Sequence, residues 1–104
     1  MLRVACFSSS NVLELSSVSL SEIAIKTALG KLHVSAAVAR QAVEDMGIRI
    51  LPYTGDHGLH LFSLPLHHRD PFDRQIIAQA ISEAIPVVTP DEKFHLYKGL
   101  RLLW

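Results

Sequence analysis

The most informative segment of the sequence is His67-His68-Arg69-Asp70-Pro71-Phe72-Asp73-Arg74-Gln75-Ile76-Ile77-Ala78-Gln79-Ala80. Its start is typical of a helix N-terminus, because Asp70 is a good N-cap and Pro71 suits the first helical position, where a missing N–H costs nothing. Apolar side chains then recur at helical spacing. They predict one buried face, made of Phe72, Ile76, Ile77, Ala80, Ile81 and Ala84.

Asp73 is the unusual residue of this predicted helix. At about 100° per residue it falls near the middle of the apolar arc. The other side of the wheel is taken by Arg74, Gln75, Gln79 and Ser82. A carboxylate directed into a protein must be paired, protonated or bound to a metal, because burying it alone costs too much. Asp73 is therefore the first candidate for a functional side chain.

Composition indicates a single globular domain spanning residues 1–104, with 49% hydrophobic residues and a formal net charge of zero. Neutrality argues against strong non-specific affinity for nucleic acid, although a local basic surface stays compatible with it. One cysteine, Cys6, excludes an internal disulfide and favours a reducing, cytoplasmic compartment. No apolar run approaches the roughly 18 residues of a membrane span.

The rest of the chain alternates between strand and helix patterns. Residues 1–11 read as an irregular leader. Strands are predicted at 12–18, 48–52, 86–89 and 101–104, and helices at 19–29, 36–46 and 54–64 and from Pro71 to the residue before Pro86. The predicted N-caps include Ser19, which opens a capping-box pattern, and Ser35. This alternation is typical of an α/β domain with a mostly parallel sheet flanked by helices.

Three acidic residues are expected to meet at one edge of that sheet. Glu22 follows the first strand, Asp91 follows the strand at 87–89, and Asp73 opens a helix that runs back along it. Ligands of such sheets bind outside the carboxyl ends of the strands. Hard cations such as Mg²⁺ or Mn²⁺ prefer oxygen ligands of this kind and activate water against phosphodiesters. Without a metal, mutual repulsion and burial should raise the pKa of at least one of the three.

Each acid also has a structural interpretation. Glu22 is in place for a capping box, with Lys26 as its partner one helical turn later. Asp70 fits a cap better than a ligand. Asp91 suits the neutralisation of a helix dipole.

Basic side chains surround the central motif. A basic lip that contacts phosphates near the acidic residues is expected from His67, His68, Arg69 and Arg74, with a merely solvated loop as the alternative. His57 and His60 have a spacing that zinc would accept, but no cysteine pair accompanies them.

These motifs, in this order, resemble the PIN-domain family, and most closely the VapC-type toxins of bacterial toxin–antitoxin pairs. The resemblance runs from about Asn11 to Trp104. It rests on Ser16-Ser17-Val18-Ser19-Leu20-Ser21-Glu22-Ile23-Ala24-Ile25-Lys26, on Leu29-Gly30-Lys31-Leu32, on the central stretch from His68 to Ala80, on Val88-Thr89-Pro90-Asp91 and on Leu103-Trp104. Ser21 stands where the family usually has an aromatic residue.

The resemblance implies a PIN-like three-layer α/β domain with the activity of a metal-dependent ribonuclease. A carboxylate-bound Mg²⁺ or Mn²⁺ would serve RNA phosphodiester hydrolysis, with Glu22, Asp73 and Asp91 as the second, third and fourth acids of the family and as catalytic and metal ligands. Asp70 and Thr89 would be auxiliary. The implied partners are RNA, a cognate antitoxin and a second copy in a homodimer, without a membrane.

One part of the family pattern has no counterpart here. Family members open with a central strand that carries an aspartate, whereas this chain has no aspartate before Asp45. The resemblance therefore implies an N-terminally truncated or shifted product, or another segment in that place. The strands at 12–17 and 87–89 should flank a gap, a shifted leader or a partner's strand. The alternative function is a catalytically inactive, truncated PIN remnant that binds an antitoxin or itself.

Overall fold

The computed structural model describes residues 5–9 and 12–103. Its strands are β1 (Cys6–Ser9), β2 (Val12–Ser16), β3 (Arg49–Leu51) and β4 (Val87–Val88), and they form one sheet in the order β3-β2-β1-β4. β2 and β3 are parallel, while β1 is antiparallel to both β2 and β4. The fold is thus α/β with helices flanking the sheet, as predicted. The sheet is mixed and not mostly parallel as expected, because β1 enters it antiparallel to both of its neighbours.

The prediction of an irregular leader over residues 1–11 is wrong for Cys6–Ser9, which forms β1. This strand lies between β2 and β4. Of the three expectations for this position, the structure has a strand from the leader there, and not a gap or a partner's strand. Phe7 explains its stability: it pairs with Glu14 on one side and Val87 on the other, and its side chain is completely buried. The burial of such a ring contributes roughly 2–3 kcal/mol.

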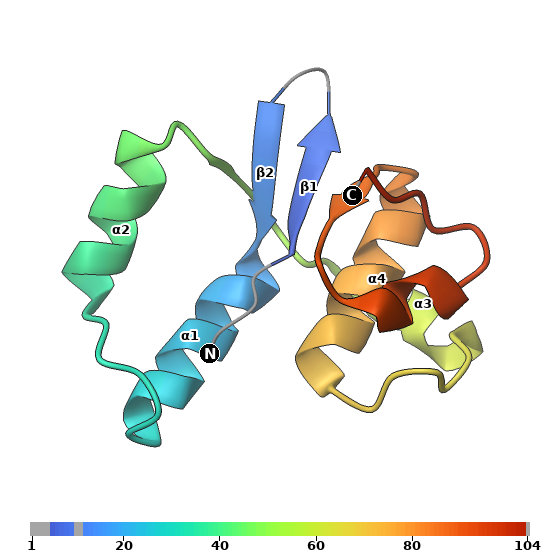
Figure 1. Cartoon of the computed structure of the whole chain (residues 1–104), viewed down its shortest axis with the longest axis horizontal. Coiled ribbons are helices and arrows are strands. Elements are labelled where there is room, and N and C mark those ends of the chain that lie inside the picture. The colour runs from blue at the N-terminus through green and yellow to red at the C-terminus, as the bar shows by residue number, and fades with distance from the viewer. Residues whose placement is uncertain (1–4, 10–11, 104) are drawn as a thin grey trace.

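Four α-helices flank the sheet, namely α1 (Ser17–Ala28), α2 (Ala36–Asp45), α3 (Gly55–His60) and α4 (Pro71–Glu83). In Figure 1, α2 lies on one side of the strands and α3 and α4 on the other. Two 3₁₀ helices, η1 (Leu61–Ser63) and η2 (Glu92–Leu96), complete the described elements. No helix in the described ranges is long and apolar enough to cross a membrane.

Helix starts follow local hydrogen bonding. Asp70 caps α4, Pro71 is its first residue, and Ser35 caps α2, all as predicted. The predicted cap at Ser19 is wrong, because Ser16 accepts from the Val18 N–H and α1 begins earlier. The predicted helix at 54–64 divides into α3 and η1.

The predicted last strand is reduced to one bridge between Leu102 and Val87. Trp104, the end of that prediction, lies outside the described residues.

The core lies around β1, β4 and the inner face of α4. It contains Phe7, Ile76, Ile77, Val87 and Phe94, all with at most 1% of their surface exposed. Gln79, placed by the helical wheel on the polar side of α4, is also completely buried. Its amide donates to the carbonyl oxygens of Leu51 (3.3 Å) and Pro52 (3.0 Å), which ties α4 to the end of β3.

Candidate metal centre

The N-terminus of α4 positions the first carboxylates of the site. One oxygen of Asp70 accepts hydrogen bonds from the N–H groups of Phe72 (2.8 Å) and Asp73 (3.2 Å). The interpretation of Asp70 as an N-cap is therefore correct. Because the cap orders the first turn, it also fixes the backbone from which the Asp73 side chain enters the pocket.

Among the acidic residues of the pocket, Asp73 has a clearly raised pKa. Its pKa is raised from 3.8 to about 6, first by burial and then by the negative charge of Asp70, while Glu22 and Asp91 add to the increase. The nearby His68 acts in the opposite direction. The expectation that burial and mutual repulsion raise the pKa of at least one carboxyl group is confirmed at Asp73.

Asp91 follows β4 in the chain and lines the same pocket as Asp73. The Asp91 N–H donates to the buried Thr89 hydroxyl (3.2 Å), which orients this turn. One carboxylate oxygen accepts from the Lys93 N–H (2.9 Å) and caps η2. The other oxygen, Oδ2, lies 3.0 Å from the Nε2 atom of His68. Asp91 thus has both the helix-terminal role and a place in the pocket.

His68 lies at the centre of the cluster. Its Nε2 is 3.0 Å from Asp73 Oδ2 and 3.0 Å from Asp91 Oδ2, and its Nδ1 accepts the Asp70 N–H (3.2 Å). The residue is only 8% exposed, and its ring meets Phe94 edge to face. The predicted basic lip includes His68, and the structure places its ring in the acidic pocket, between two carboxylates.

Glu22 faces the same pocket but is differently engaged. Its side chain is almost completely buried, and its Oε2 lies 2.6 Å from the Lys26 ammonium. This hydrogen bond raises the pKa of Lys26. The i,i+4 pairing considered as an alternative for Glu22 is present. In the described part of the chain, the tight group whose ligand atoms lie within 4.8 Å of one another consists of His68, Asp73 and Asp91, without Glu22.

Together these side chains form a pocket of about 220 Å³. Its lining residues are Ala5, Glu22, Lys26, His68, Asp70, Asp73, Thr89, Asp91 and Phe94. Two carboxylate oxygens from separate elements approach one point, which fits the hard oxygen ligands and remaining water sites of Mg²⁺ or Mn²⁺. The residues present therefore fit a divalent cation held by Asp73 and Asp91.

The predicted basic lip does not form as a unit. Arg69 is exposed, whereas the guanidinium of Arg74 donates to the carbonyl oxygens of Pro65 (2.9 Å) and Leu64 (3.3 Å). Arg74 thereby fixes the loop before α4, because its donors satisfy backbone groups of that loop.

His57 has a structural role. Its Nε2 lies 2.7 Å from Glu83 Oε1, and its Nδ1 accepts the Thr54 N–H (2.9 Å). The first contact joins α3 to the end of α4, and the second caps α3. Neither His57 nor His60 belongs to the potential metal-binding group of the described residues.

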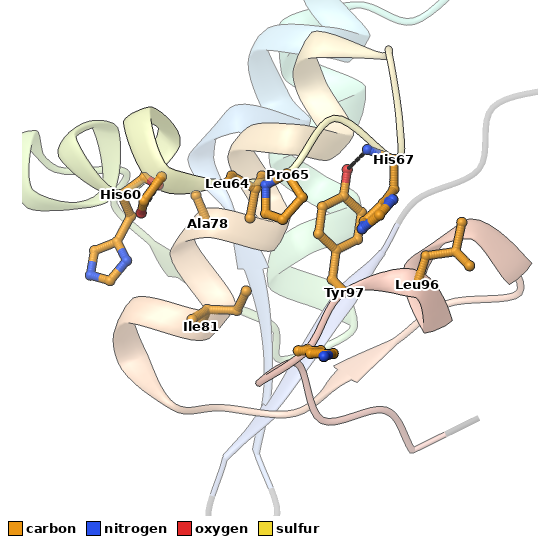
Figure 2. A pocket seen from close by; sticks show the side chains of 10 residues that line it. His60, Leu64, Pro65, His67, Ala78, Ile81, Leu96 and Tyr97 are labelled. Atoms are coloured by element: carbon orange, nitrogen blue, oxygen red, sulfur yellow. Dashed lines mark hydrogen bonds between the residues drawn. The ribbon is translucent and has the colours of Figure 1, made fainter.

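A second pocket, of about 520 Å³, is lined by Tyr97 together with residues such as His60, His67 and Ile81 (Figure 2). The Tyr97 hydroxyl accepts the backbone N–H groups of His67 (3.2 Å) and His68 (2.8 Å), so it connects this pocket to the backbone of the acidic one. Its lining includes His60, His67 and Lys98 and no acidic residue. The two neighbouring pockets therefore differ in charge.

Sequence reasoning missed the place of His68 at the centre of the acidic pocket. A usable signal existed for His68, since a histidine two residues before an N-cap can accept the cap's own N–H. The approach of His68 to Asp91 has no local signal, because the two residues are separated by 23 positions.

The chain matches the family model of the PIN domain over residues 4–100. No curated protein matches the chain. The PIN fold is in general a nuclease-type fold whose members typically bind a divalent metal ion, in agreement with the acidic group found here. The match covers nearly the whole sequence, and the chain therefore belongs to the PIN-domain family.

Proposed function

We propose that this protein is a metal-dependent ribonuclease of the VapC toxin type that hydrolyses RNA phosphodiester bonds with Mg²⁺ or Mn²⁺. The observation that carries the proposal is the meeting of Asp73 and Asp91 at one point, with an Asp73 pKa raised to about 6. Perturbed carboxylates in a pocket are typical of functional sites, because a bound cation offsets their repulsion.

The acidic residues of the pocket, Thr89 and Lys26 have distinct parts in this proposal. Asp73 and Asp91 would hold the cation. Thr89 orients Asp91, and Asp70 fixes the first turn of α4. A bound divalent cation supplies a Lewis acid for the phosphodiester and lowers the pKa of water. Glu22 is the remaining acid of the pocket, and its pairing with Lys26 keeps one positive charge beside the place of the phosphate.

RNA would approach over the less acidic surface beside the site. Arg69 is exposed there, and His67 and Lys98 line the neighbouring pocket. Such groups supply the phosphate contacts that position a nucleic acid. A cytoplasmic location is part of the proposal, together with a cognate antitoxin and a second copy of the chain as protein partners.

The test is RNA cleavage by the purified protein with Mn²⁺, Mg²⁺ or a chelator. Asp73→Asn and Asp91→Asn should each abolish cleavage that requires the cation. Asp45→Asn is the matched control, because Asp45 is an exposed aspartate at the end of α2 and does not line the acidic pocket. Cleavage that persists in Asp73→Asn, or that does not respond to the chelator, would contradict the proposal.

A second candidate is a protein-binding module without catalysis. It is favoured by an apolar pocket of about 360 Å³ whose lining includes Leu20, Ile23, Val38, Ala42 and Val43, from α1 and α2. No residue of α2 is buried within the chain, so its apolar face is available to a partner. β1, in its central place, carries no carboxylate.

Light scattering tests the second candidate. If α2 forms a homodimer, Val43→Glu should convert the dimer to a monomer while the fold, followed by circular dichroism, is kept. Absence of RNA cleavage together with this conversion would favour the binding module over the ribonuclease.

A further inference from the structure

The metal function proposed for the acidic pocket does not explain why His68 lies at its centre. Its ring nitrogen lies 3.0 Å from each of the two carboxylates that would hold the cation. We propose that His68 is a positioning residue that holds Asp73 and Asp91 together in the metal-free protein and leaves this place when a divalent cation binds. The inference rests on the proposed metal function and adds a competition between a side chain and the ion.

The hydrogen bonds of the ring assign its tautomer. The Asp70 N–H can only donate, so His68 Nδ1 accepts and carries no proton. The neutral ring then carries its proton on Nε2, which donates towards the carboxylate oxygens of Asp73 and Asp91. An Nε2 that carries a proton has no free electron pair for a metal. In this arrangement His68 is a hydrogen-bond donor and not a ligand.

The Nε2–H also takes the space that the cation needs. Mg²⁺ and Mn²⁺ prefer carboxylate oxygen ligands, so an ion held by Asp73 and Asp91 would need the carboxylate oxygens that the Nε2–H now faces. The positive end of the N–H dipole already points to these oxygens. Because the ion and the N–H compete for the same electron pairs and repel each other, both cannot be accommodated.

The surroundings confine the change to the side chain. The backbone N–H groups of His67 and His68 are both held by the hydroxyl of Tyr97, a residue of the core. The ring itself contacts Phe94 only edge to face, which leaves rotation about the side-chain bonds as the way out. The pocket can therefore open without movement of α4.

Two substitutions separate the functions of the two ring nitrogens. In His68→Asn, the amide oxygen can still accept the Asp70 N–H, but nothing occupies the position of Nε2. In His68→Gln, the longer side chain returns an N–H donor to that position. Mn²⁺ binding is measured by calorimetry on wild type, both variants, Asp73→Asn and Asp45→Asn.

We expect His68→Asn to bind Mn²⁺ about tenfold more tightly than wild type, because the ion no longer displaces a hydrogen bond to charged groups. His68→Gln should resemble wild type. A weaker or unchanged Mn²⁺ affinity of His68→Asn, while Asp73→Asn still abolishes binding, would overturn the inference and leave the proposed metal function intact. Absence of Mn²⁺ binding by every protein would overturn both.

A measurement on the unsubstituted chain keeps the inference testable if His68→Asn does not fold. With nitrogen-labelled histidine, the His68 Nε2–H should be protected from exchange in the metal-free protein. Saturating Mg²⁺ should remove that protection. A signal that stays protected at saturating Mg²⁺ would overturn the inference, because the ring would then not have left the carboxylates.

Discussion

The ionised carboxylate of Asp73 lowers the free energy of unfolding of the metal-free protein. Its pKa of about 6 in the folded protein exceeds the ordinary value of 3.8 because the charged form is half-buried beside other carboxylates. Between these two values the folded chain binds more protons than the unfolded chain. The free energy of unfolding contributed by Asp73 therefore falls as pH rises through this window and levels off above it.

The substitution Asp73→Asn should remove this pH dependence in metal-free protein. Above about pH 7 the variant should be more stable than wild type by about 1 kcal/mol, because carboxylate repulsion is relieved while an amide oxygen can still accept from His68. Urea unfolding between about pH 4 and pH 8 measures the effect. A loss of roughly 3 kcal/mol would instead mean that a buried cation had lost its partner. Arg74 is not that cation, since it donates to backbone carbonyls.

At the scale of the element, α4 begins where the site requires it because Asp70 caps it. Asp70→Ala should destabilise the protein by about 1 kcal/mol, since two N–H groups lose their acceptor. Asp70→Asn should keep most of the cap. Both substitutions remove a charge that raises the Asp73 pKa, so both should lower that pKa. Thermal unfolding and titration of Asp73 by nuclear magnetic resonance distinguish capping from charge. Equal stability of the two variants would exclude a capping role.

A second prediction at this level concerns β1. Phe7→Ala should cost roughly 3–4 kcal/mol, because the ring is completely buried and belongs to the strand between β2 and β4. Leu13→Ala on the adjacent β2 is the matched control, since Leu13 is 46% exposed and should lose less than about 1 kcal/mol. Chemical denaturation gives both values. A small effect of Phe7→Ala would show that the leader strand is not part of the folded sheet.

At the scale of the whole molecule, a cation in the acidic pocket should stabilise the fold by mass action. At about one hundred times its dissociation constant, Mn²⁺ would add roughly 2.7 kcal/mol to the free energy of unfolding. Melting temperatures should be higher with Mn²⁺ than with chelator in wild type and in Asp45→Asn, and equal in Asp91→Asn. Equal melting temperatures in wild type would count against a metal centre.

The sequence by itself determined the local features of this protein. Two helix starts could be predicted, that of α4 at Asp70 and Pro71 and that of α2 at Ser35, because caps join groups two or three positions apart. The burial of Asp73 could also be predicted, since helical periodicity alone places it on the apolar face.

Only the tertiary structure decided which distant groups meet. β1 has four residues and no period that assigns its partners, so its antiparallel place between β2 and β4 follows from the burial of Phe7 against the rest of the core. Gln79 is buried where its amide nitrogen can donate to carbonyl groups at the end of β3. His68 enters the acidic pocket because Asp91, distant in sequence, offers its nitrogen an acceptor. Such non-local hydrogen bonds and contacts depend on the packing of whole elements, and for that reason no local pattern in the sequence records them.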